Sequence, residues 1–178
     1  MNEFKNDIEA IRKRARAKMG AGSITQAYKA DVKRVIDVLN EVLATEIVCV
    51  LRYKNHFYMA KGINMDAVKA EFLQHANDEQ GHADRVAERI TQLGGDPDLN
   101  PATLAARSHA EYKEASTLEG MIKEDLVAER IAIETYNEIA RWLGTDDITS
   151  RRLIEDLLAK EEEHANDLAD LLEKVGKK

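Results

Sequence analysis

The chain has few of the residues that build turns, disulfides and membrane spans. Its 178 residues include two prolines, nine glycines and a single cysteine, Cys49. One cysteine cannot form an intramolecular disulfide, and it excludes zinc or iron–sulfur modules that need several; as a lone residue, Cys49 is either a small buried hydrophobe or a ligand. No apolar run approaches 18 residues, and the first residues lack the apolar segment of a secretory signal. We therefore expect a cytoplasmic protein that does not enter the membrane.

Composition favours long helices around one core. Hydrophobic residues make up 44% of the chain and charged residues 33%, and scarce turn residues disfavour β-sandwiches. Residues 1–34 carry nine Lys or Arg against four acidic residues, although the whole chain has a net charge of −7. This basic arm is either a solvated helix face or a surface that reaches a polyanion such as DNA. We predict a basic N-terminal extension over 1–24 and one domain over 25–178.

Apolar residues recur every three or four positions along most of the chain. This spacing predicts a short basic helix at 4–18 and four long helices at 25–61, 65–93, 117–143 and 149–175. Glycines and both prolines punctuate them, and residues 102–114 form a loop with one short helix. Four amphipathic helices bury their stripes best as a bundle, so we predict an all-α antiparallel four-helix bundle with a long crossover between the second and third helices.

Each of the four apolar stripes contains one glutamate: Glu46, Glu79, Glu129 and Glu161. An ionised carboxylate in a bundle core costs several kcal/mol unless a partner compensates it. Four of them at similar depth would also repel one another, so they are either protonated or gathered around a cation. A multivalent metal ion is the simplest compensation, because carboxylate oxygens are preferred ligands of such ions.

Two of these glutamates begin a Glu-x-x-His motif, Glu79 to His82 and Glu161 to His164. The i, i+3 spacing puts both side chains of each motif on one helix face. Each motif follows a lone core glutamate by about the same distance, 33 residues in the first case and 32 in the second. The chain thus reads as two related hairpins, which together supply six ligands to a two-metal site. The alternative is that the helices are rotated relative to this interpretation, so that all six side chains are charges on the surface.

This arrangement is similar to the ferritin-like superfamily, in which two helices give a lone Glu and two give Glu-x-x-His. Residues 39–46, 78–85 and 125–129 resemble bacterioferritin and the bacterioferritin-like Dps-type mini-ferritins, within a resemblance that covers roughly 35–175. The resemblance implies a di-iron site. Its terminal ligands would be Glu46 and His82 for one iron and Glu129 and His164 for the other, and its bridging ligands would be Glu79 and Glu161.

Departures from the bacterioferritin pattern refine the expectation. Gln80 stands where bacterioferritins have the methionine that binds haem, so no haem is expected. The 14 residues after His164 leave no counterpart for their fifth helix, and the connection at 94–116 is longer than theirs. With the basic extension, these differences favour a 12-subunit homo-oligomeric cage over a 24-subunit one. Rubrerythrin is disfavoured because its cysteine-rich domain is absent.

By this resemblance, the expected function is ferroxidase activity and iron storage. The di-iron site would oxidise Fe(II) with O₂ or H₂O₂ and so protect against oxidative stress. One alternative is a di-iron or di-manganese peroxidase or catalase that stores no metal. Another is a DNA-binding shell protein in which the metal has a secondary role.

Several other residues have weaker assignments. Tyr53 and Tyr136 each follow a lone glutamate by seven residues. They are either hydrogen-bond donors or radical sinks beside the metals, or core aromatics. His75 and Asp78 lie near the first motif and are candidates for an accessory iron site. His56 is expected on a solvated face.

Overall fold

The computed structural model describes residues 7–62 and 65–176, and this part of the chain is helical with no β-strand. The elements are α1 (Ile8–Ala15), the 3₁₀ turn η1 (Met19–Ala21), α2 (Val32–Met59), α3 (Met65–Gln92), α4 (Leu104–Arg107), α5 (Leu118–Leu143) and α6 (Ile148–Gly176). The predicted all-α class is confirmed. No helix in these ranges is long and apolar enough to span a membrane.

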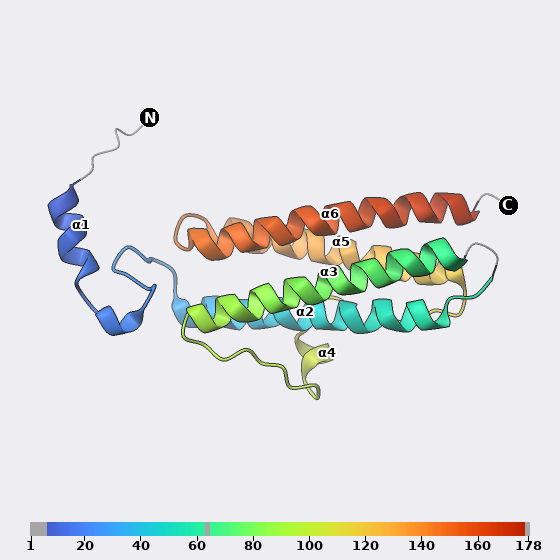
Figure 1. Ribbon diagram of the computed structural model, residues 1–178, viewed down its shortest axis with the longest axis horizontal. Helices are drawn as coiled ribbons and strands as arrows, with labels where there is room; N and C mark the ends of the chain where they lie inside the picture. The colour runs from blue at the N-terminus through green and yellow to red at the C-terminus, as the bar shows by residue number, and fades with distance from the viewer. Residues whose placement is uncertain (1–6, 63–64, 177–178) are drawn as a thin grey trace.

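The four long helices form two antiparallel pairs packed side by side (Figure 1). The first hairpin is α2 with α3, and the second is α5 with α6. Residues 93–117 connect the two hairpins along the outside of the bundle, and α4 within this crossover packs on α2 (Figure 1). The four-helix bundle with a long crossover is therefore as predicted.

The beginnings of two helices differ from the prediction. α2 starts at Val32 rather than at residue 25, because the Asp31 carboxylate caps it by accepting from the backbone N–H of Arg34 at 3.2 Å. The residues before it form turns that the apolar spacing did not distinguish from helix. In the described part of the N-terminal segment, α-helix extends from Ile8 to Ala15 and so ends before the predicted residue 18, and residues 4–6 of the predicted 4–18 helix lie outside the described residues.

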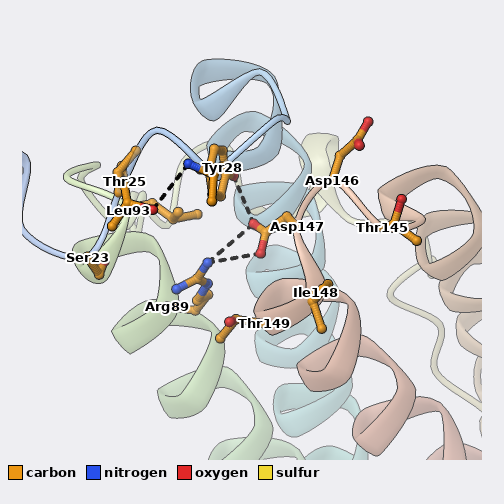
Figure 2. A pocket seen from close by; sticks show the side chains of 12 residues that line it. Ser23, Thr25, Tyr28, Arg89, Leu93, Thr145, Asp146, Asp147, Ile148 and Thr149 are labelled. Atoms are coloured by element: carbon orange, nitrogen blue, oxygen red, sulfur yellow. Dashed lines mark hydrogen bonds and ion pairs between the residues drawn. The ribbon is translucent and has the colours of Figure 1, made fainter. Parts of the chain in front are cut away.

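A polar clamp ties the N-terminal segment to the end of the bundle (Figure 2). The Tyr28 hydroxyl donates to Asp147 at 2.8 Å, and the Arg89 guanidinium donates to the same carboxylate at 3.0 Å. Asp147 also caps α6 by accepting from the backbone N–H of Ser150 at 2.9 Å. These bonds border a pocket of about 200 Å³. Beyond the clamp, α1 stands away from the bundle (Figure 1), and the predicted boundary after residue 24 stays a prediction.

Two apolar clusters fill the bundle, one toward each end. The first is built on Val35, Leu39, Leu43, Val86, Ile90, Ile139, Ile154 and Leu157. The second is built on Tyr53, Val68, Phe72, Met121, Ile122 and Leu168. Along every long helix the glutamates of interest lie between the residues of these two clusters. The core therefore has apolar ends and a polar middle, which is where a buried site can be held rigidly.

Cys49 lies in a smaller apolar cluster with Ala110 and Ala128. It is buried, and burial raises the pKa of its thiol well above the usual value. Among the described residues it belongs to none of the groups of side chains that converge as metal ligands. This environment fits a small buried hydrophobe.

Candidate metal centre

The six predicted ligands meet in the polar middle of the bundle. Each long helix contributes to the set, α2 and α5 with one residue and α3 and α6 with two. None of the six is more than 6% exposed. The set, in chain order, is Glu46, Glu79, His82, Glu129, Glu161 and His164. Because all six are buried, the interpretation of these residues as surface charges is wrong.

Their ligand atoms fall into two overlapping groups of four, and within each group all atoms lie within 4.8 Å of one another. Glu79 and Glu161 belong to both groups. The first group adds Glu46 and His82, and the second adds Glu129 and His164. Two neighbouring positions that share two carboxylates have the form of a bridged pair of ion sites.

Each group contains one imidazole, and its Nδ1 lies close to carboxylate oxygens of the same group. Nδ1 of His82 lies 3.3 Å from Glu46, 3.4 Å from Glu79 and 3.1 Å from Glu161. Nδ1 of His164 lies 3.3 Å from Glu79 and 3.4 Å from Glu161. Nδ1 of each imidazole is therefore surrounded by carboxylate oxygens, and together these atoms are a mixed nitrogen and oxygen ligand set.

Several atoms of this centre are buried without a hydrogen bond. They are Oε1 of Glu79, both carboxylate oxygens of Glu161 and Nδ1 of His164. Buried polar atoms are usually hydrogen-bonded, because leaving them unpaired costs free energy. Four carboxylates and two imidazoles are a donor set that suits divalent iron or manganese. The residues present thus fit a pair of such ions.

The environment of the centre shifts the pKa values of its carboxyl groups and imidazoles. Burial and the neighbouring Glu79 raise the pKa of Glu46 to about 8, and burial with Glu79 and Glu161 raises the pKa of Glu129 well above its usual value. Burial opposes charge on the imidazoles. The surrounding carboxylates outweigh it, Glu161 first in both cases, and they raise the pKa of His82 to about 12 and that of His164 to about 10. A metal ion that binds here must therefore displace protons from these residues.

Two tyrosines support the lone glutamates across the bundle. Tyr53 of α2 donates to Glu129 of α5, and Tyr136 of α5 donates to Glu46 of α2. Burial raises the pKa of both hydroxyls well above 10, so both stay protonated donors. This reciprocal pairing follows from the repeated spacing of the two hairpins and fixes the orientation of each carboxylate.

A buried ion pair beside the centre was missed from the sequence. Asp125 accepts from Nε of Arg52 at 3.1 Å, and its other oxygen lies 2.8 Å from Nδ1 of His56. His56 is fully buried, so the expectation of a solvated histidine is wrong. Asp125 lies one turn before Glu129 on the same helix face, which was the available signal. The network joins α2 to α5 next to the ligands.

His75 contacts the centre from the side. Its ring stacks on His164 at 3.9 Å between centroids, and its Nδ1 lies 3.1 Å from the Tyr53 hydroxyl. Burial and the nearby His164 lower the pKa of His75 to about 3. Asp78, the predicted partner of His75 in an accessory iron site, instead lies 3.3 Å from Nε2 of His164. The carboxylate that approaches Nε2 of His75 most closely is Glu71, at 3.3 Å.

Comparison with known proteins gives consistent matches. A family model described as a ferritin-like domain matches residues 36–177. A dodecameric thioferritin, the bacterioferritin-related protein of Bacteroides fragilis, is 33% identical with a TM-score of 0.80 over 84% of this chain and 90% of its own. A ferritin-like diiron-carboxylate structure from Bacillus anthracis is 30% identical with a TM-score of 0.70 over 81% and 99%. The DNA protection during starvation protein of Pyrococcus furiosus is 30% identical over 80% of this chain and 78% of its own.

Proposed function

The chain belongs to the family of ferritin-like domains, and from this premise we propose that it oxidises ferrous iron and stores the product, in defence against oxidative stress. The observation that carries the proposal is the pair of overlapping ligand groups that share Glu79 and Glu161. The description of the Bacillus anthracis neighbour as a diiron-carboxylate protein supports iron as the metal.

In this proposal two ferrous ions are the substrate. Glu46 and His82 bind one ion, Glu129 and His164 bind the other, and Glu79 with Glu161 lies between them. Each ion loses one electron. The two electrons, with two protons, reduce one H₂O₂ to two waters or one O₂ to H₂O₂. The centre binds ions in both oxidation states, because oxygen-rich ligation suits the ferric product and the imidazoles suit the ferrous substrate.

A direct test compares oxidation in matched variants. Glu161→Gln keeps the shape of a shared ligand and removes its charge, and Glu162→Gln makes the same change at an exposed neighbour. After anaerobic loading with Fe(II) and addition of H₂O₂, we expect Glu161→Gln to oxidise iron at least about tenfold more slowly than wild type. Glu162→Gln should match wild type. Equal rates in all three proteins would refute the proposed centre.

The homo-oligomeric cage is the part of the proposal that separates storage from simple turnover. The Bacteroides fragilis neighbour is described as dodecameric, and we extend that state to this chain. Twelve chains of 20.0 kDa give about 240 kDa. Light scattering with metal analysis after loading is decisive. A dimer near 40 kDa that retains two ions per chain would instead favour a di-iron or di-manganese peroxidase or catalase.

A second candidate function is DNA binding by the N-terminal arm. Arg12, Lys13, Arg14, Arg16 and Lys18 are all exposed on or just after α1. The Pyrococcus furiosus relative carries DNA protection in its name. Binding should weaken steeply between about 50 and 200 mM salt, and deletion of residues 1–22 should abolish it while iron oxidation continues. If the wild-type protein did not shift DNA in a gel at low salt, the basic residues would be a solvated helix face without a DNA partner.

We propose that both iron oxidation and DNA binding take place in the cytoplasm.

A further inference from the structure

A second cluster of ligand-type side chains lies beside the six-residue centre. Glu71 and His75 stand one turn apart on α3, and Asp167 faces them from α6. Nε2 of His75 lies 3.3 Å from Oε1 of Glu71 and 3.9 Å from Oδ2 of Asp167. One ligand atom from each residue lies within 4.8 Å of the other two. One imidazole and two carboxylates at this spacing can bind a single divalent cation.

Nε2 of His75 is the unusual atom of this cluster. The side chain is fully buried, and Nε2 makes no hydrogen bond. A buried polar atom without a partner is rare enough to need an explanation. Its nearest charged neighbours are the Glu71 and Asp167 carboxylates, which only accept hydrogen bonds when ionised. A lone pair on Nε2 would face two anionic acceptors, an arrangement that a cation between them stabilises.

The other ring nitrogen indicates that Nε2 does carry the lone pair. Tyr53 donates its single hydroxyl proton to Glu129. Its oxygen, 3.1 Å from Nδ1 of His75, is then an acceptor for the proton on Nδ1. A neutral imidazole has one ring proton, so Nε2 is left with the lone pair. The residues around His75 therefore select the tautomer that a metal ligand needs.

His75 could instead be an additional ligand of the six-residue centre, since it also converges with Glu129 and His164. The ring orientation argues against this alternative. Nδ1 lies on the side of Glu129, because the Tyr53 hydroxyl bridges the two, and that hydroxyl already engages it. The free nitrogen is Nε2, and it points toward Glu71 and Asp167.

Access also distinguishes this cluster. The Glu71 side chain is 27% exposed and that of Asp167 is 42% exposed, whereas every ligand of the six-residue centre is buried. We propose that Glu71, His75 and Asp167 bind a third divalent cation, separate from the ions of the six-residue centre, with Nε2 of His75 as its nitrogen ligand. Mixed nitrogen and oxygen donors suit Fe²⁺, Mn²⁺, Co²⁺ and Zn²⁺. This site goes beyond the proposed function and does not depend on it.

Equilibrium dialysis of the full chain against Co(II) tests the proposal. Wild type should bind about one cobalt ion per chain more than the double variant Glu71→Gln, Asp167→Asn. Asp170→Asn, an exposed change on the same helix, is the matched control and should bind as wild type does. The double variant Glu79→Gln, Glu161→Gln should still bind cobalt, at about one ion per chain, through Glu71, His75 and Asp167.

Anomalous scattering from cobalt-loaded crystals of the wild-type protein locates the ion directly, so this test does not depend on how well a variant folds. The proposal predicts a peak within bonding distance of Nε2 of His75. A peak at Nδ1, between Glu129 and His164, would overturn it and make His75 part of the main centre. Equal cobalt binding by wild type and the Glu71→Gln, Asp167→Asn variant would also overturn it. Cobalt bound in wild type by the six-residue centre alone would refute the third site and leave the proposed function standing.

Discussion

The metal-free protein should lose stability as the pH rises from about 5 to 8.5, and Glu46→Gln should remove much of that loss. Unfolded Glu46 ionises near 4.5, whereas burial and Glu79 keep the folded carboxyl protonated until about 8. Between these values the folded state binds more protons than the unfolded state. The stabilising effect is therefore complete below 4.5 and is lost as the pH rises through 8. His82 and His164, whose pKa values are also raised, add a loss of the same sign above pH 6.5.

The size of the effect follows from the shift. A rise from 4.5 to about 8 corresponds to about 5 kcal/mol at 1.36 kcal/mol per pKa unit. For a chain of this length, 1 kcal/mol changes the melting temperature by about 2–4 °C. Since Glu46 shares its site with other titrating groups, we expect Glu46→Gln to melt about 10 °C above wild type at pH 8.5, and near wild type at pH 5.

Differential scanning calorimetry of chelator-treated protein between pH 5 and 8.5 measures this difference. Glu162→Gln, an exposed change on α6, controls for the general effect of removing a carboxylate and should track wild type at every pH. The comparison between variants at one pH cancels every contribution that the variants share. If wild type and Glu46→Gln gave parallel curves across this range, Glu46 would not be held protonated in the core, and the reasoning would be refuted.

Three further predictions concern the two buried imidazoles, the ion pair of Arg52 and the polar clamp at the end of the bundle. Metal binding at pH 7 should release protons from His82 and His164, so the affinity for metal should rise with pH. The buffer takes up the released protons, so the calorimetric heat of binding should depend on the ionisation enthalpy of the buffer. A binding heat that is the same in all buffers would contradict this prediction. Asp125→Asn leaves the buried Arg52 charge uncompensated and should cost about 3 kcal/mol in urea unfolding, with exposed Asp170→Asn unchanged. Asp147→Ala removes both the N-cap of α6 and the carboxylate partner of Arg89, so it should lower the melting temperature by about 10 °C. Asp146→Asn, an exposed change at the neighbouring residue, should leave the melting temperature unchanged. Equal melting temperatures for the two variants would contradict a stabilising role of the clamp.

The long helices were predictable from sequence because their apolar spacing is regular over many turns. The same signal exposed the buried glutamates, since a charged residue within an apolar stripe is visible without coordinates. The start of α2 was not predictable in this way. Residues 25–31 carry apolar side chains at helical spacing, and the chain turns there because Asp31 caps the helix and Tyr28 reaches Asp147.

The support around the ligands was harder to foresee. His56 and Asp125 are 69 residues apart, and their contact depends on how α2 packs against α5. Spacing along one helix cannot reveal such a partner. The grouping of His75 with Asp167 has the same origin, because Asp167 belongs to a different helix. Repeated spacing did indicate that Tyr53 and Tyr136 were equivalent, but the crossing of their hydrogen bonds between hairpins required the packed bundle.

The central claim is that two metal ions lie side by side in the middle of the bundle and share Glu79 and Glu161. Anomalous scattering from iron-loaded crystals tests it most directly. The account predicts two peaks about 3.5–4 Å apart, both bonded to the shared carboxylates. One peak should also be bonded to Glu46 and His82, and the other to Glu129 and His164. A single peak among these six residues, or none, would contradict the account.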